Sequence, residues 1–205
     1  MGQRSKRAAR CATCRLHQAD CLCAAIPRLD LATRIVVVMH RREASKPTAT
    51  ARLALLALPN SELAIHGHDD ARVDLRHLHD AGRRVLALFP ADDARPLDAA
   101  LLAADPRPVT LVVPDGSWRQ ASKAVRRIPG LAEAERVTLP PGAPSGYRLR
   151  REPRPGGLAT FEAIARALGI LESLAVEATL TALLERMVSA TLKTRGAPPP
   201  GQTGH

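Results

Sequence analysis

From Arg34 onward the sequence alternates short apolar runs with longer amphipathic stretches, and this alternation restricts the possible folds more than any other feature. The first run, at 35–39, is Ile-Val-Val-Val-Met, and a short run of β-branched residues is typical of a buried strand. We expect further strands at 62–66, 85–89, 110–113 and 136–139, and helices at 48–58, 74–81, 96–103, 118–127, 159–168 and 171–194. Because crossover helices let successive strands run in the same direction, this order predicts an α/β fold with a mostly parallel sheet and flanking helices.

The composition is that of one compact domain. The chain has 205 residues, of which 45% are hydrophobic and 24% charged, which is the usual composition of a globular protein. Aromatic residues make up only 2%, so the core must be built from Ala, Leu and Val. An RNA-binding sheet that stacks bases on exposed aromatic rings needs several such rings on neighbouring strands. The composition therefore excludes that class of protein.

The chain is strongly basic, with a formal net charge of +10. Such a charge attracts polyanions, and arginine, the dominant basic residue here, can hold a phosphate with two hydrogen bonds. The charge therefore favours a nucleic-acid partner. A genomic bias toward Ala, Arg and Pro is the alternative explanation, and the charge alone leaves both open.

Neither a membrane span nor a targeting segment is evident in the sequence. No window approaches the ~20 apolar residues that a span requires, and the first six residues lack the apolar core of a signal peptide. We therefore expect a cytoplasmic protein without membrane contact, and we favour a monomer.

The sequence divides into three parts. Four cysteines lie within the first 23 residues and none occur later, so we expect a basic zinc-binding module at 1–27 and an α/β domain at 28–194. The Pro- and Gly-rich residues 195–205 are expected to be a disordered tail. Within the α/β domain, 140–157 is rich in Pro, Gly and Arg and is too long for an ordinary connection, so we expect it to be functional.

The cysteines have the spacing of a structural metal site. They are Cys11, Cys14, Cys21 and Cys23. Four thiolates complete a tetrahedral shell around Zn²⁺ and leave no open position for chemistry, which predicts a small structural module with four cysteine ligands. A disulfide pair or unmetallated thiols are the alternatives, and a reducing compartment disfavours the disulfide. His17 lies between the pairs and could replace one thiolate, but a lone histidine in a basic loop is more often solvated.

An acidic turn follows the strand expected at 110–113. Asp115 and Ser117 stand between that strand and the helix at 118–127. In open α/β sheets the ligand crevice lies outside the carboxyl ends of the strands, so this is a favoured place for a functional carboxylate. The alternative is that the two residues only form a turn and a helix N-cap.

Several motifs in order along the chain resemble those of the DTW-domain family. Asp115-Gly116-Ser117-Trp118 resembles the Asp-x-Thr-Trp signature, and the cysteine cluster resembles the family's N-terminal metal motif. Other similar segments are His40-Arg41-Arg42-Glu43, Thr50-Ala51-Arg52-Leu53, Leu88-Phe89-Pro90, Tyr147-Arg148-Leu149-Arg150 and Leu158-Ala159-Thr160-Phe161-Glu162-Ala163. Ser117 departs from the usual Thr but keeps the hydroxyl, Arg41 replaces the frequent Pro, and Ala159 replaces the usual Ser. Because Ala159 lacks the serine hydroxyl, we expect Thr160 to contribute the hydrogen bond at this place.

The resemblance implies a SPOUT-like α/β fold with a knotted C-terminal half. It also implies transfer of the 3-amino-3-carboxypropyl group of S-adenosylmethionine to the N3 ring nitrogen of a tRNA uridine, with release of methylthioadenosine. Asp115 is the expected general base, with water as the alternative proton acceptor. The expected cofactor-binding residues are Phe89, Pro90, Pro114, Ser117, Trp118, Leu139, Leu158 and Thr160; for Trp118, packing in the core is an equal alternative. A SPOUT-like RNA methyltransferase and a non-catalytic zinc-containing RNA-binding protein are the competing functions.

Basic residues in two places are expected to contact tRNA. Arg119 and Lys123 recur at helical spacing in 118–127, where a solvated helix face is the alternative. Arg148, Arg150 and Arg151 stand in the long loop beside the expected site. These residues are therefore the candidates for phosphate contacts.

Overall fold

A six-stranded parallel sheet forms the centre of the protein. The computed structural model describes residues 9–46, 50–68, 72–79, 82–147, 149 and 157–195. The strands are β1 (Arg34–His40), β2 (Ser61–His66), β3 (Arg84–Leu88), β4 (Arg95–Pro96), β5 (Val109–Asp115) and β6 (Glu135–Thr138). They lie in the order β2-β1-β5-β3-β6-β4, and every pairing is parallel. The mostly parallel α/β fold expected from the sequence is confirmed.

Helices connect and cover the strands. The α-helices are α1 (Arg41–Ala44), α2 (Thr50–Ala57), α3 (Ala99–Ala104), α4 (Trp118–Arg127), α5 (Thr160–Leu171) and α6 (Leu174–Arg195). Short 3₁₀ turns stand at η1 (Gln18–Asp20), η2 (Cys23–Ala25) and η3 (Arg76–His79). Within the described part of the chain, no helix combines the length and apolarity that crossing a bilayer demands.

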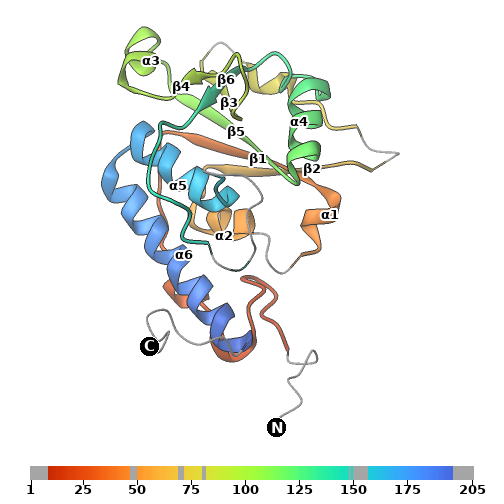
Figure 1. The fold of residues 1–205 in the computed structure, drawn as a ribbon, viewed down its shortest axis with the longest axis vertical. Helices are drawn as coiled ribbons and strands as arrows, with labels where there is room; N and C mark the ends of the chain where they lie inside the picture. The colour runs from red at the N-terminus through yellow and green to blue at the C-terminus, as the bar shows by residue number, and fades with distance from the viewer. Residues whose placement is uncertain are drawn as a thin grey trace.

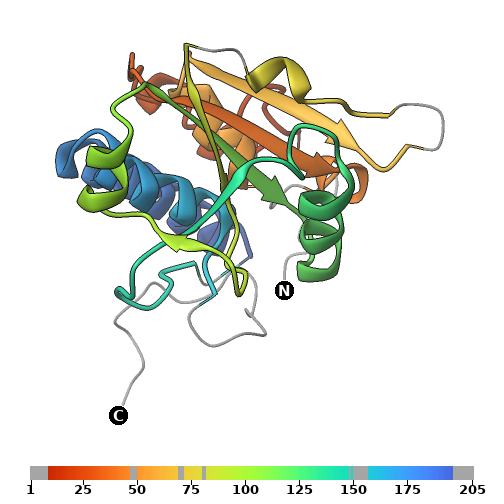
Figure 2. The same cartoon turned by 90° about the horizontal axis from the view of Figure 1, so that it is seen from above.

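Helices lie on both faces of the sheet, as Figures 1 and 2 show, and the interior strands β1, β3 and β5 are mostly buried. In β1, Val37 and Met39 point into the cluster that contains the buried residues of α2, α5 and α6, whereas Val36 and Val38 point into the cluster that contains those of α4 and η3. Alternate side chains of a strand project to opposite faces, so a run of apolar residues without polar interruption serves both layers. The continuous apolar pattern of 35–39 thus follows from the position of β1 inside a three-layer domain.

Two of the helices expected from the sequence differ from those observed. Of the helix expected at 74–81, the described residues 74–79 form only η3, because the Leu75 backbone N–H donates to Pro129 O at 2.8 Å and Asp74 accepts the backbone N–H of Arg76. The helix expected at 96–103 begins at Ala99, because Pro96 belongs to β4 and pairs with Thr138 of β6. The two-residue strand β4 was not predicted.

The N-terminal cysteine segment packs against the α/β body. Leu16 is buried in the same cluster as α5 and α6, and the Thr194 hydroxyl donates to Asp20 Oδ2 at 2.9 Å. The boundary at residue 27 stays a prediction, as does the knotted course of the chain. Helix α6 extends to Arg195, one residue into the expected tail, and 196–205 lie outside the described residues.

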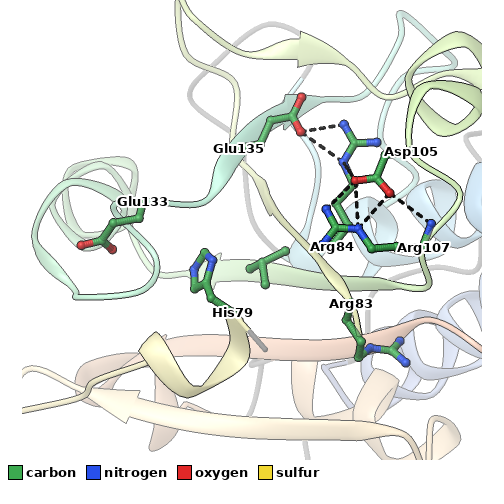
Figure 3. A pocket seen from close by; sticks show the side chains of 8 residues that line it. His79, Arg83, Arg84, Asp105, Arg107, Glu133 and Glu135 are labelled. Carbon is green, nitrogen blue, oxygen red and sulfur yellow. Dashed lines mark hydrogen bonds and ion pairs between the residues drawn. The ribbon is translucent and has the colours of Figure 1, made fainter. Parts of the chain in front are cut away.

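A buried arginine joins the strands at the amino-terminal edge of the sheet. The guanidinium of Arg84 donates to Glu135 Oε2 at 2.6 Å and to Leu101 O at 2.7 Å, and its side chain is only 8% exposed. Figure 3 shows Arg84 between Glu135 and Asp105, beside a cavity of about 280 Å³. Arg107 pairs with Asp105 on the exposed side of the same network. The charged groups of this network are paired with one another, so we assign them a role in stabilising the fold.

Removing Glu135 should therefore destabilise the fold. Glu135→Ala leaves the buried Arg84 guanidinium without its closest carboxylate, and we expect a loss of about 1–3 kcal/mol in the free energy of unfolding, measured by urea denaturation. Arg107→Ala removes a solvent-screened ion pair of equal length, 2.6 Å, and is the matched control with a much smaller effect. Equal effects of the two substitutions would contradict this interpretation.

Candidate functional site

The carboxyl ends of three neighbouring strands, β5, β3 and β6, bring together most of the site residues expected from the sequence. Phe89 and Pro90 follow β3, Pro114 and Asp115 end β5, and Leu139 follows β6. The start of α5, with Leu158 and Thr160, reaches the same edge, because Thr160 is hydrogen-bonded to Asp115. In parallel α/β sheets this is the edge at which ligands bind.

Asp115 and Thr160 form a short hydrogen bond at this edge. The Thr160 hydroxyl donates to Asp115 Oδ1 at 2.6 Å, and both residues are partly exposed. Thr160 is the first residue of α5, so this contact ties the helix to the end of β5 across 45 residues of sequence. A hydroxyl bonded to one carboxylate oxygen fixes the orientation of the whole group. The carboxylate is thereby held at the edge of the sheet, where a substrate can reach it.

Glu162 holds the start of α5 in place. Its carboxylate accepts the Ala159 backbone N–H at 2.8 Å, the Gly146 N–H at 2.7 Å and the Ser145 hydroxyl at 2.6 Å. Ala159 has no side-chain acceptor to cap the helix, so Glu162 supplies the anchoring contact to the chain before α5. Glu162 was not among the residues predicted to serve the site. A Glu three residues after a helix start is the signal that indicates such a role.

Trp118 stacks on Phe89 beside the acidic turn. The two ring centroids lie 4.6 Å apart with planes 27° from parallel. Phe89 is buried, whereas Trp118 is 39% exposed. Trp118 thus packs on a core residue and also presents surface at the strand ends, and its role in binding the cofactor stays a prediction.

Ser117 is the N-cap of α4. Its hydroxyl accepts the Gln120 backbone N–H at 3.4 Å, and the Gln120 side chain accepts the Ser117 N–H at 2.7 Å, which together form a capping box. The turn-and-cap role considered from the sequence is thus present for Ser117. It fixes the path of the backbone immediately after Asp115.

Arg52 lies near the same edge with its Nε unsatisfied. Thr50, the first residue of α2, accepts the Phe161 backbone N–H at 3.4 Å, so the starts of α2 and α5 meet. Two residues later, Arg52 Nε is buried and has no hydrogen-bond acceptor among the described residues. Burying such a donor without an acceptor costs free energy. From the sequence, Arg52 stood out only as part of a motif and not as a site residue.

A cavity of about 490 Å³ adjoins this edge. It lies between the segment that follows β6 and the helices α5 and α6. Leu139 and Glu162 line it, together with Arg166, whose guanidinium donates to Ala143 O at 2.6 Å. Pockets that hold nucleoside-sized ligands commonly have ~300–1,000 Å³. Of the expected cofactor-binding residues, only Leu139 is among those that line the cavity.

The basic residues expected to contact RNA are only partly covered by the structure. Arg119 and Lys123 are exposed on α4, as are Arg126 and Arg127 at its end. Their exposure is compatible with both alternatives, a phosphate-binding face and a solvated helix face. Arg148, Arg150 and Arg151 lie outside the described residues.

The four cysteines converge as a metal site requires. All four Sγ atoms lie within 4.8 Å of one another, with Cys11 and Cys23 at 3.5 Å and Cys14 and Cys21 at 3.8 Å. Four sulfurs bound at about 2.3 Å to a tetrahedral zinc lie about 3.8 Å apart. The arrangement of the thiols therefore fits zinc.

The protonation of the thiols also favours a cation. Hydrogen bonds, first from the backbone N–H of Cys14, lower the pKa of Cys11 to about 6. Burial, followed by the neighbouring thiols, raises the pKa of Cys23 to about 12. Thiols this close cannot all ionise unless a positive charge offsets them, and a bound zinc ion supplies that charge.

Comparisons with known proteins identify relatives of this chain. The chain is 30% identical over 172 residues to tRNA-uridine aminocarboxypropyltransferase 2 of Drosophila melanogaster, covering 80% of this chain and 67% of that protein. It is 28% identical over 173 residues to the protein of the same name from Macaca fascicularis, covering 82% and 58%. The chain thus spans about three fifths to two thirds of the length of these relatives.

A solved structure and a family profile complete the comparison. The SAM-dependent rRNA:acp-transferase Tsr3 from Vulcanisaeta distributa matches with 17% sequence identity and a TM-score of 0.45, covering 82% of this chain and 86% of that one. The profile of the DTW domain matches residues 8–192, a span that includes the cysteine cluster, the Asp115 turn and α5. This protein therefore belongs to the DTW-domain family.

Proposed function

We propose that this protein transfers the 3-amino-3-carboxypropyl group of S-adenosylmethionine to N3 of a tRNA uridine. The Asp115–Thr160 contact at the carboxyl edge of the sheet is the observation that carries the proposal, because it holds a carboxylate where a ligand reaches a parallel sheet. The names of the two animal relatives support the same reaction. A cytoplasmic location, where thiols stay reduced, is part of the proposal.

The chemistry assigns one task to the carboxylate. N3 of uridine carries a weakly acidic proton, which Asp115 accepts as N3 forms a bond to the γ-carbon of the methionine moiety. The bond between that carbon and the sulfonium sulfur breaks, and its electron pair leaves with methylthioadenosine. A sulfonium is already an activated leaving group, so the residues of this chain need only position the nitrogen and remove the proton.

The surrounding residues supply binding. The donor would lie against Phe89, Pro90, Pro114 and Leu139 at the strand ends, with Ser117, Trp118, Leu158 and Thr160 at the starts of α4 and α5. Arg52, which has no acceptor for its Nε among the described residues, offers a positive charge close to these elements for an anionic group of the substrates. The exposed face of α4 with Arg119 and Lys123, and the loop with Arg148, Arg150 and Arg151, would contact tRNA phosphates.

The product identifies the reaction. After incubation of unmodified tRNA with the protein and S-adenosylmethionine, mass spectrometry should find a uridine that carries the added aminocarboxypropyl mass, together with methylthioadenosine in solution. Nuclease mapping then gives the position of the modified uridine. A methyl mass with S-adenosylhomocysteine would establish a methyltransferase instead, and an unchanged tRNA pool would favour a non-catalytic RNA-binding protein.

Asp115 should be required for the chemical step and not for binding. Asp115→Asn keeps the size of the side chain but removes the base, and we expect the rate to fall by ~10²–10⁴-fold. Calorimetry should show donor affinity close to that of the wild type. Thr160→Val, which removes only the orienting hydrogen bond, should cost about tenfold. If Asp115→Asn retained full activity, Asp115 would not be the general base, and water would be the proton acceptor.

We further propose that the cysteine cluster binds one structural zinc ion. Elemental analysis should find one zinc per chain, and chelation should lower the thermal midpoint, because Leu16 and Asp20 connect this segment to the core and to α6. Cys14→Ser should reduce the zinc content. His17→Ala is the matched control and should keep it. Loss of zinc from His17→Ala, or a zinc-free wild type, would refute the assignment of four cysteine ligands.

A further inference from the structure

A side-chain bridge connects the end of β1 to the turn that carries Asp115. The Gln120 amide of α4 accepts the Ser117 backbone N–H through Oε1 at 2.7 Å. Its Nε2 lies 3.2 Å from Nδ1 of His40, the last residue of β1. Since the carbonyl end of the amide is bound to an N–H group, the NH₂ end must be the one that faces His40. The Gln120 side chain therefore donates to the histidine.

The hydrogen bonds fix the protonation state of His40. Nδ1 also lies 3.2 Å from the Arg42 backbone N–H, which donates to it. A ring nitrogen that accepts from two N–H groups carries no proton of its own, so His40 is neutral with its proton on Nε2. If Nδ1 were protonated, its own N–H would face the N–H groups of Gln120 and Arg42, and both hydrogen bonds would be lost.

The ring has little room to move away. A Cβ atom at Gly67 would lie 2.9 Å from His40 Nε2, and one at Gly116 would lie 3.5 Å from His40 Cβ and 3.0 Å from Gln120 Cβ. The His66 ring meets His40 edge-on, with centroids 5.1 Å apart. Gly67 has a φ of +91°, which also favours glycine. His40 is thus closely packed between the chain after β2 and the turn after β5.

We propose that His40 is a positioning residue for Asp115: through Gln120 it holds the backbone of the Asp115-Gly116-Ser117 turn, and only the neutral ring can do so. The β1–β5 register supports this link, because Met39 pairs with Asp115 and places His40 beside Gly116. The inference rests on the proposed function and deepens it, since it makes transfer depend on the protonation of His40.

The charges around His40 act in the same direction. Burial, followed by Arg42 and Arg41 on its own segment, lowers the pKa of His40, and His68 beyond β2 adds to this effect. Glu43 opposes it. Burial also lowers the pKa of His66, with contributions from His40 and from Lys123 of α4. The folded chain therefore binds a proton at His40 less readily than the unfolded chain does, and the stability contributed by the neutral ring declines as the pH falls below about 6.5.

Nuclear magnetic resonance of the full chain tests the bridge without reference to catalysis. At pH 7.5 the His40 ring should be the Nε2–H tautomer, and the amide signals of Gly116 and Ser117 should shift with the same midpoint as His40, below about 6.5. In Gln120→Leu these amides should no longer follow His40. Amide signals that do not respond to His40 in the folded wild type would overturn the inference.

Kinetics of the transfer reaction provide the second measurement. His40→Leu should lower kcat about tenfold at pH 7.5, with little change in KM for the donor. His40→Asn, whose Oδ1 can accept in place of Nδ1, should restore most of kcat and remove the part of the acidic decline that belongs to His40. His77→Asn, a change at an exposed histidine of η3, is the control and should leave the profile unchanged.

The outcomes separate the two proposals. If the wild type transfers no aminocarboxypropyl group, the proposed function fails, and the magnetic resonance measurement still decides whether His40 controls the turn. If the wild type is active but His40→Asn keeps the wild-type acidic decline, or folded His40→Leu retains full kcat, the positioning role of His40 is wrong.

Discussion

The parallel pairing of β1 with β5 at the centre of the sheet is the constraint on which the site depends. It places the ends of both strands at one edge, with Met39 opposite Asp115. The contacts of Thr160 with Asp115 and of Gln120 with Ser117 depend on that register, because both reach the turn at the end of β5. A shift by one residue would turn Asp115 to the other face of the sheet and separate it from Thr160.

Sequence patterns predicted the sheet better than the contacts of the site. The apolar runs located five strands to within one or two residues, and the pattern was clearest for β1, β3 and β5, which are buried on both faces. They missed β4, which is two exposed residues long, and they predicted a helix where tertiary contacts hold η3. The partners Thr160 of Asp115 and Gln120 of His40 lie 45 and 80 residues away, and no local propensity encodes such distances.

The basic residues that the structure describes have different surroundings at the two edges of the sheet. Arg84 and Arg107 are neutralised by carboxylates at the amino edge, where they stabilise the fold. Arg119 and Lys123 are exposed on α4, which starts at the carboxyl edge. The net charge of +10 that suggested a polyanionic partner is therefore unevenly distributed, since some basic residues are paired with carboxylates and others are exposed. Among these four residues, Arg119 and Lys123 carry exposed charge on the helix that follows the Asp115 turn.

The contact between Thr160 and Asp115 also has a consequence for protein synthesis. The carboxylate, the strand that carries it and most of the sheet emerge from the ribosome before α5 is made. Until α5 docks, Asp115 lacks the hydroxyl that orients it and the starts of α2 and α5 cannot meet. The carboxylate therefore stays without its orienting partner until α5, one of the last elements to be translated, has docked.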